Sequence, residues 1–273
     1  MHYGVINSLN DDYFVHPNGF AFDFKSKAKL TFVMFLGNLP KKYFNLKQRL
    51  DFWKTQIKRD TKTEINVVIV ADVRENTLYG ANYSGVEGVC NSVWELSKIL
   101  LDTIYLKNQT TRTIVFADCG GCIPAMLSSS IVPYHSVNLT TPYFQIIGSE
   151  NEFDTSQFSM WFARELSINI FDTLQQYNNY FDVLSFCDQY TKNPNQILNL
   201  HWATNIIGTD LLFRSKAELL PKRPNLTITD HVLPLNIEGH MLATYLFNKR
   251  EYQKMVAKQI DIQKKILDNS FIL

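Results

Sequence analysis

The chain has 273 residues, of which 45% are hydrophobic, 13% aromatic and 19% charged. This length and aromatic content allow a full hydrophobic core, which excludes a disordered chain and a small disulfide-stapled module. Lysine and arginine total 27 against 26 acidic residues, and the net charge of +1 gives no electrostatic case for binding nucleic acid or an anionic membrane surface. Four cysteines are too few for a disulfide scaffold and favour a reducing compartment.

The sequence predicts neither a targeting segment nor a membrane span. Met1–Asp12 lacks the basic segment and apolar run of a signal peptide. The longest apolar runs, such as Ile65–Ala71, have the length of strands, far below the roughly 20 residues that cross a bilayer. These features indicate a cytoplasmic protein without a transmembrane segment, and they specify no oligomeric state.

Short apolar runs alternate with segments of helical period along the first half of the chain. Near-continuous Val/Ile runs between helices are typical of a parallel sheet that is buried on both faces. In chain order, the expected elements are a strand at Lys29–Leu36, a helix at Lys41–Ile57, a strand at Ile65–Ala71, a helix at Gly85–Leu106, a strand at Thr113–Ala117 followed directly by a helix, and weaker strands at Ser136–Leu139 and Gln145–Ile147.

The segment Ser156–Asn193 differs in composition, because it is rich in Phe, Tyr, Asn and Gln and has no clear strand pattern. We expect a helical insertion or lid there. No repeat or linker divides the chain, so the prediction is one α/β domain over residues 1–273 with a mainly parallel sheet flanked by helices. After the insertion, the expected elements are a strand at Ile197–Trp202, a helix at Leu211–Leu220, a strand at Leu226–Asp230 and a helix from Gly239 to the end.

The most informative segment is Thr113–Leu127, where an apolar strand enters a turn of small residues and then a helix. Within it, Ala117–Gly121 fits the nucleophile elbow G-x-S-x-G, with Ala for the first Gly and Cys for Ser. Small residues are needed because the nucleophile sits on a strained turn, where bulk would collide with the neighbouring strand or helix. Backbone N–H groups at the helix start favour an anion, so the pattern predicts that Cys119 is a nucleophile.

The same residues allow two other interpretations. Cys119 and Cys122 form a C-x-x-C motif between a strand and a helix, as in thioredoxin-like redox proteins. In those proteins the motif lies near the start of a much shorter unit, whereas several strands and helices precede it here. The two cysteines could also be ordinary small buried residues at a strand–helix junction.

The C-terminal half favours the elbow, because it supplies an acid and a histidine in the chain order of an α/β-hydrolase triad. Asp210 lies in a polar loop after the strand Ile197–Trp202, and His240 opens the last helix. The sequence therefore predicts a sheet of α/β-hydrolase type. It also predicts a triad of Cys119, Asp210 and His240, in which the histidine is the general base and then the acid. Asp230 stays open as an alternative acid.

Two backbone positions are candidates for an oxyanion hole. In this fold one donor is the N–H of the residue after the nucleophile, which here is Gly120. The other comes from the loop after an early strand, where Leu36 or Gly37 could donate and Gly37 would allow close approach. The sequence has no metal-ligand motif and no glycine-rich nucleotide fingerprint, so neither a metal nor a bound cofactor is expected.

Several short segments together resemble α/β-hydrolase-like proteins of bacterial surface-polysaccharide loci, which include capsule O-acetyltransferases. That resemblance implies an acetyl group transferred from acetyl-CoA to a carbohydrate hydroxyl through an acyl-enzyme. It makes an O-acetyltransferase or an esterase acting on a surface polysaccharide the expected function. The segments that carry it are Phe20–Lys25, Phe32–Lys41, Ile69–Asp72, the elbow, His201–Leu220 and the residues around His240.

The chain departs from that family at the elbow, where the family has Ser with a Gly two residues before it. Cys119 and Ala117 stand at these positions. Three explanations follow: a native thiol nucleophile, an engineered replacement of Ser, or an inactive remnant in a glycan-binding or scaffolding protein.

Overall fold

The computed structural model describes residues 12–25, 27–37, 45–71, 89–90, 93–107, 112–129, 131–142 and 193–269. Its strands are β1 (Tyr13–His16), β2 (Phe20–Asp23), β3 (Leu30–Phe35), β4 (Asn66–Val70), β5 (Arg112–Asp118), β6 (Ser136–Thr140), β7 (Ile197–Ala203) and β8 (Leu226–His231). They form one sheet of eight strands in the order β1-β2-β4-β3-β5-β6-β7-β8. The pairs β1–β2 and β2–β4 are antiparallel and the remaining pairs are parallel, which confirms the predicted mainly parallel sheet.

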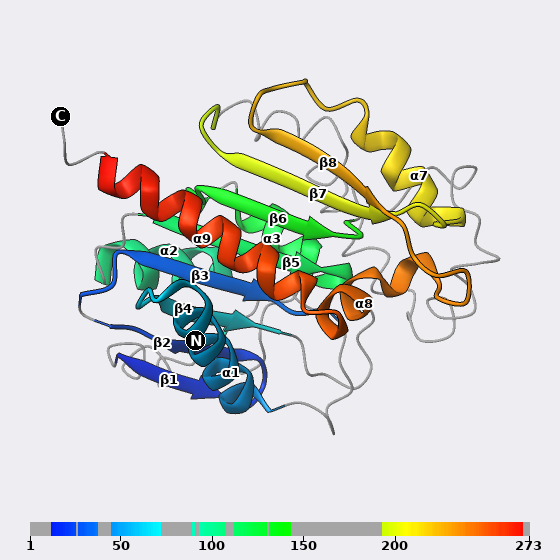
Figure 1. The fold of residues 1–273 in the computed structure, drawn as a ribbon. Helices are drawn as coiled ribbons and strands as arrows, with labels where there is room; N and C mark the ends of the chain where they lie inside the picture. The colour runs from blue at the N-terminus through cyan, green and yellow to red at the C-terminus, as the bar shows by residue number, and fades with distance from the viewer. Residues whose placement is uncertain are drawn as a thin grey trace.

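Helices cover both faces of this sheet. Figure 1 shows α1 and α9 on one face and α2 and α3 on the other. Every residue of β3 and β4 is buried as a result, and this explains their unbroken runs of apolar residues. The helices are α1 (Leu46–Thr61), α2 (Val93–Leu101), which continues as a π-helical segment (Asp102–Lys107), α3 (Cys122–Ser128), α7 (Gly208–Ala217), α8 (Leu242–Asn248) and α9 (Glu251–Asn269).

Aromatic side chains fix α1 and α9 over the centre of the sheet. The Trp53 ring of α1 lies 5.1 Å from the ring of Phe32 on β3, between centroids. The Tyr252 ring of α9 lies 5.6 Å from Phe116 on β5 and 6.1 Å from Trp53. Such pairs add specific ring contacts to the burial of large apolar surfaces. They hold in place the strand that leads into the elbow.

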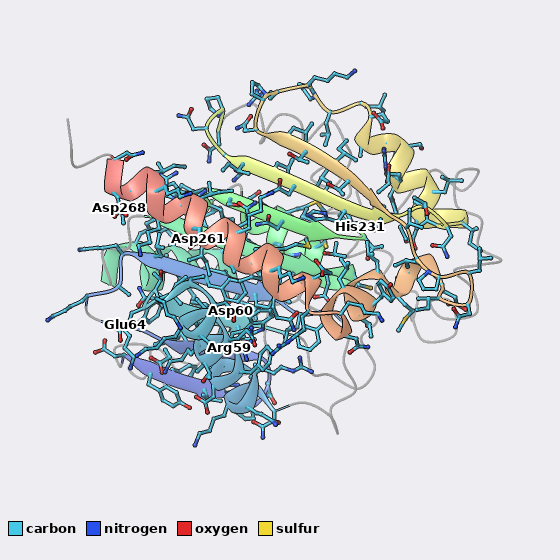
Figure 2. The ribbon with its side chains drawn as sticks, in the orientation of Figure 1. Arg59, Asp60, Glu64, His231, Asp261 and Asp268 are labelled. Atoms are coloured by element: carbon cyan, nitrogen blue, oxygen red, sulfur yellow. The ribbon has the colours of Figure 1, made fainter. Side chains whose placement is uncertain are left out.

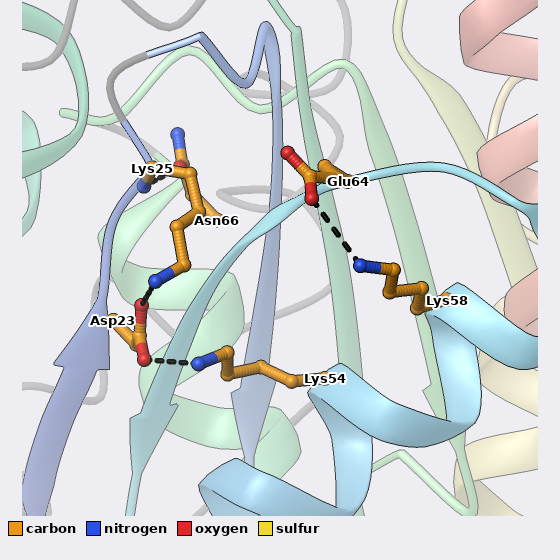
Figure 3. Close-up of polar contacts among 6 residues, drawn as sticks. All are labelled: Asp23, Lys25, Lys54, Lys58, Glu64 and Asn66. Carbon is orange, nitrogen blue, oxygen red and sulfur yellow. Dashed lines mark hydrogen bonds and ion pairs between the residues drawn. The ribbon is translucent and has the colours of Figure 1, made fainter.

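A buried carboxylate ties β2 to α1. Asp23 at the end of β2 accepts a hydrogen bond from Lys54 of α1 and lies 3.4 Å from the Lys25 ammonium, while its own side chain is 8% exposed (Figure 3). The Lys25 backbone N–H donates to the Asn66 side chain of β4 at 2.7 Å. The more exposed pair Lys58–Glu64, 3.4 Å apart, contributes much less to stability because water screens it.

The helix expected at Lys41–Ile57 begins later and ends later than predicted. Asn45 has an extended backbone and caps the helix, because its side chain accepts from the Gln48 N–H at 2.9 Å. The helix therefore starts at Leu46, and it continues to Thr61. Its apolar residues Leu50, Trp53 and Ile57 recur at helical spacing and are buried.

Other boundaries also differ from the predictions. Val89 and Cys90 are not helical, so the helix expected from Gly85 begins at Val93 among the described residues. The last helix is broken, because Arg250 has a left-handed backbone (φ 62°) that separates α8 from α9. This break turns the chain so that α9 crosses the sheet beside α1 (Figure 1).

The antiparallel hairpin of β1 and β2 was not predicted, since each strand has only four residues. The candidate strand Gln145–Ile147 and nearly all of the expected helical insertion lie outside the described residues, and Asn193, the last residue of that insertion, is not helical. The single-domain assignment stays a prediction. None of the helices in the described ranges combines the length and the apolar character needed to cross a membrane.

Candidate active site

The turn after β5 has the geometry of a nucleophile elbow. Cys119 lies directly after the strand, opens a 3₁₀ turn and has a left-handed backbone (φ 48°), which is strained for a residue with a side chain. Gly121 packs against the end of β3, where a Cβ atom would lie 2.5 Å from the Phe35 carbonyl oxygen and 2.9 Å from Leu36. Close packing therefore requires a glycine at the last position of the motif.

Gly121→Ala is expected to lower the free energy of unfolding by about 1–3 kcal/mol, because the backbone of β3 or of the elbow must move to admit the methyl group. Urea denaturation followed by tryptophan fluorescence measures this change. Gly37→Ala is the matched comparison: its Cβ would lie 3.0 Å from the Asp118 carbonyl oxygen, so its cost should be smaller. Equal stability of Gly121→Ala and the unmodified protein would contradict this account of the turn.

The structure brings together the three side chains predicted as a triad. The Cys119 Sγ lies 3.5 Å from His240 Nε2, and His240 Nδ1 lies 3.2 Å from Asp210 Oδ2. The three residues follow β5, β7 and β8, so they meet at the carboxyl edge of the parallel strands, where open α/β sheets bind ligands. Asp210 lies in the first turn of α7 and not in a loop as predicted. The prediction missed the start of this helix because no side chain caps it, so the sequence carries no capping signal there.

The charges of this array favour a protonated histidine. The hydrogen bond to Asp210 and, next, the contact with Cys119 raise the pKa of His240 to about 10, against the opposing effect of burial. His240 is therefore an imidazolium at neutral pH, with Nδ1–H directed at the carboxylate and Nε2–H at the sulfur. The Nε2–H directed at the Cys119 sulfur can stabilise negative charge that develops on that atom.

Asp230, the alternative acid, has a different partner. The Arg214 guanidinium donates to both of its carboxylate oxygens at 2.8 Å and lowers the pKa of Asp230. Arg214 belongs to α7 and also lies over the Trp202 ring, 5.6 Å from the centroid. The Asp230 carboxylate thus anchors α7 to β8, while Asp210 faces the histidine.

Cys122 points away from Cys119 and into the packing between helix and sheet. Its thiol donates to the Thr140 carbonyl oxygen at 3.5 Å, and burial raises the pKa of Cys122 well above its ordinary value. Both cysteines are free thiols. A buried thiol that stays protonated is poorly suited to thiol–disulfide exchange, which needs a thiolate.

The two candidate donors on the loop after β3 are already paired. The Leu36 N–H donates to the Val70 carbonyl oxygen at 2.8 Å, and the Gly37 N–H donates to the Asp118 carboxylate at 3.3 Å. The loop does lie against the nucleophile, since a Cβ on Gly37 would be 3.3 Å from the Cys119 Cβ. An oxyanion could receive the Gly37 N–H only by displacing the carboxylate, a partner that the sequence analysis missed. Gly120, the other candidate, is buried in the elbow itself.

Burial raises the pKa of Asp118 to about 6, partly offset by the bond from Gly37. Its proton therefore leaves close to neutral pH, which links the state of this loop to pH. The sequence signals this pairing with Gly37 only by having an acidic residue, Asp118, at the variable position before Cys119.

The other described histidines have structural partners. His201 Nδ1 and His231 Nε2 are 3.1 Å apart, and burial lowers the pKa of His201 to about 3. Figure 2 shows His231 at the end of β8. His135 Nδ1 accepts the Thr113 N–H at 3.1 Å. Within the described part of the chain, no group of three or more His, Cys, Asp or Glu side chains could hold a metal ion.

No family profile and no curated protein matches the sequence of this chain. Solved structures do match it in fold. An esterase of Pyrobaculum calidifontis superimposes with a TM-score of 0.58 and 13% identity over 95% of this chain and 89% of its own. Esterase B of Lactobacillus rhamnosis gives 0.55 and 12% over 93% and 84%, and a capsule O-acetyltransferase of Neisseria meningitidis serogroup A gives 0.50 and 13% over 90% and 93%. The chain therefore has the α/β-hydrolase fold.

Proposed function

We propose that this protein is an acyl-transfer enzyme that forms a thioester acyl-enzyme on Cys119. The observation that carries the proposal is the contiguous array of Cys119, His240 and Asp210 at the carboxyl edge of the sheet. On many folds the acyl-transfer triad consists of a nucleophile hydrogen-bonded to a histidine, which is in turn hydrogen-bonded to an orienting carboxylate. Similarity in fold to esterases and to an O-acetyltransferase supports the same reaction class.

In the proposed acylation step, Cys119 acts as a thiolate beside the protonated His240. The Cys119 sulfur attacks the carbonyl carbon of the donor, an S–C bond forms, and the carbonyl electron pair moves to oxygen. The Gly120 N–H stabilises this oxyanion, joined by the Gly37 N–H when Asp118 releases it. As the intermediate collapses, the bond to the leaving group breaks and His240 Nε2 gives its proton to that group. In this half-reaction His240 acts as the general acid, since it begins protonated.

Deacylation restores the resting state. The neutral His240 left by the first step accepts the proton of an incoming hydroxyl, whose oxygen attacks the thioester carbon. The C–S bond then breaks and Cys119 leaves as a thiolate beside the new imidazolium. Asp210 orients the ring throughout, because its carboxylate accepts the Nδ1–H at 3.2 Å.

A cysteine nucleophile favours a thioester as the donor. Exchange between acetyl-CoA and Cys119 converts one thioester into another, so bonds of the same kind break and form. Formation of a thioester from an oxygen ester is uphill, since the ester is the more stable linkage. We therefore propose acetyl-CoA as the acyl donor and a hydroxyl as the acceptor that makes transfer favourable.

The proposed acceptor is a carbohydrate hydroxyl of a bacterial surface polysaccharide. It is supported by the resemblance of the sequence segments and by the fold shared with a capsule O-acetyltransferase. The second candidate is an esterase in which water is the acceptor, and the fold shared with two esterases favours it. Either reaction needs a reduced Cys119, and we place the protein in the cytoplasm for that reason.

Intact-protein mass spectrometry after incubation with acetyl-CoA tests the proposal. We expect a mass increase of one acetyl group that peptide mapping assigns to Cys119 and that hydroxylamine removes, as it removes a thioester. Adding a purified surface polysaccharide should discharge the acyl-enzyme faster than water for a transferase, and no faster for an esterase. A catalytically silent binding protein would gain no mass. A thiol oxidoreductase would also gain none, but after added oxidised glutathione it would lose two hydrogens with formation of a Cys119–Cys122 bond, the glutathione being reduced.

A further inference from the structure

The segments that carry the acid and the histidine leave the sheet separately. The last backbone bond between them runs from the Thr204 N–H to the His231 carbonyl oxygen at 2.9 Å. Beyond it, one segment leads to Asp210 and the other to His240, yet the two side chains meet at 3.2 Å. A shift of about 1 Å in either segment would break this bond and can cost 10²-fold in rate.

A side chain outside the array joins the two segments. Asn205 follows β7, and its Nδ2 donates to the Ile237 carbonyl oxygen at 2.7 Å. This donor lies five residues before Asp210 in the chain, and the acceptor lies three residues before His240. The bond is thus a direct tie between the acid-bearing and histidine-bearing segments.

Backbone packing beside this bond fixes the same two segments. Gly239, the residue before His240, is buried against Ile206, the residue after Asn205. A Cβ atom on Gly239 would lie 2.8 Å from the Ile206 Cγ2 and 2.9 Å from its backbone nitrogen. Only glycine allows the two backbones to approach this closely. The segments therefore have little freedom to slide while both contacts hold.

We infer that Asn205 is a positioning residue that sets the distance between Asp210 and His240 by tying the segment after β7 to the segment after β8. The inference rests on the proposed function, because the orientation of the imidazole matters to acyl transfer only if the array performs it. Asn205 does not itself contact the reacting sulfur; it acts through the position of His240.

Asn205→Leu is the main test variant. It keeps the approximate size of the side chain and removes the donor, and it also removes Asn205 Oδ1, which is buried and accepts no hydrogen bond from the described residues. The protein should therefore fold. Asn225→Ala is the matched control, since this Asn also ties two segments, its Nδ2 donating to the Pro194 carbonyl oxygen at 2.8 Å, away from the array.

Two measurements are made on each variant: the rate of Cys119 acylation by acetyl-CoA, and the NMR titration of the His240 ring, assigned with His240→Ala. In Asn205→Leu we expect acylation to fall about 10- to 100-fold and the His240 midpoint to move from about 10 toward its ordinary value. Asn225→Ala should change neither, and the two variants should have similar melting temperatures.

The inference is wrong if Asn205→Leu keeps both the His240 midpoint and the acylation rate, or if Asn225→Ala lowers both to the same extent. Gly239→Ala provides a second test. Its added methyl group would clash with Ile206 and force the two segments apart, so the titration midpoint of His240 should shift in this variant too. The titration needs no acyl transfer. If the unmodified protein forms no acyl-enzyme while the midpoint still falls in Asn205→Leu, the positioning role stands and the proposed function fails.

Discussion

Cys119→Ala is expected to abolish the acyl-enzyme and to lower acyl transfer by about 10³- to 10⁶-fold. Removing the sulfur removes the group that would carry the acyl chain in the proposed thioester, so this covalent route is closed. Turnover of p-nitrophenyl acetate, followed at 25 °C with acetyl-CoA acylation in parallel, measures the loss. Cys122→Ala is the control, because it removes a neighbouring thiol that faces Thr140 and should leave acylation in place.

Persistent acyl transfer in Cys119→Ala would show that the elbow is not the site of chemistry. Loss of activity in Cys122→Ala together with an intramolecular disulfide in the oxidised protein would instead support the redox interpretation. These two variants thus separate the readings that the C-x-x-C pattern left open.

Cys119→Ser addresses the departure of the chain from the serine of related elbows. A serine hydroxyl is not ionised near neutral pH, so His240 would have to be neutral to accept its proton. The bond from Asp210 holds the pKa of His240 high, and only the contribution from the thiolate is lost. The variant should therefore be slow at neutral pH and gain rate as the pH rises. Activity equal to that of the cysteine protein at neutral pH would contradict a resting thiolate–imidazolium pair.

The parts of the molecule that the sequence predicted well are those with local causes. The buried strands follow from continuous Val/Ile/Phe runs, as in β3 and β4, which the helices cover on both faces. The elbow follows from small residues in a fixed pattern, and Gly121 shows why: its neighbours leave no room for a Cβ. The order of Cys119, Asp210 and His240 along the chain predicts a triad, and the structure brings these three side chains into contact.

The parts that were missed depend on contacts between distant residues. Nothing near Gly37 in the sequence indicates that its N–H donates to Asp118, 81 positions away. The tie from Asn205 to Ile237 spans 32 positions and involves a backbone carbonyl that carries no sequence signal. Likewise, the sequence does not reveal that Arg214 binds Asp230, because this contact forms only in the folded chain.

Asp210→Asn is expected to lower acylation by about 10²- to 10⁴-fold, while leaving the fold intact. The amide keeps the size of the carboxyl group but removes the charge that stabilises the imidazolium. It can also turn its NH₂ toward Nδ1 and so favour the wrong tautomer of the ring. Since the bond to Asp210 is the largest cause of the raised pKa of His240, that pKa should fall toward its ordinary value. The thiolate would then lose its charged partner across the neutral range.

Asp230→Asn is the matched variant, because it makes the same chemical change to the acid that Arg214 binds. It should weaken the anchor between α7 and β8, seen as a modest loss of thermal stability, and change acylation far less than Asp210→Asn. The pH dependence of acylation distinguishes the two: the decline at high pH, where His240 loses its proton, should move to lower pH only in Asp210→Asn. If the two variants lost activity in the reverse order, Asp230 would be the acid and the 3.2 Å contact between His240 and Asp210 would have no role in catalysis.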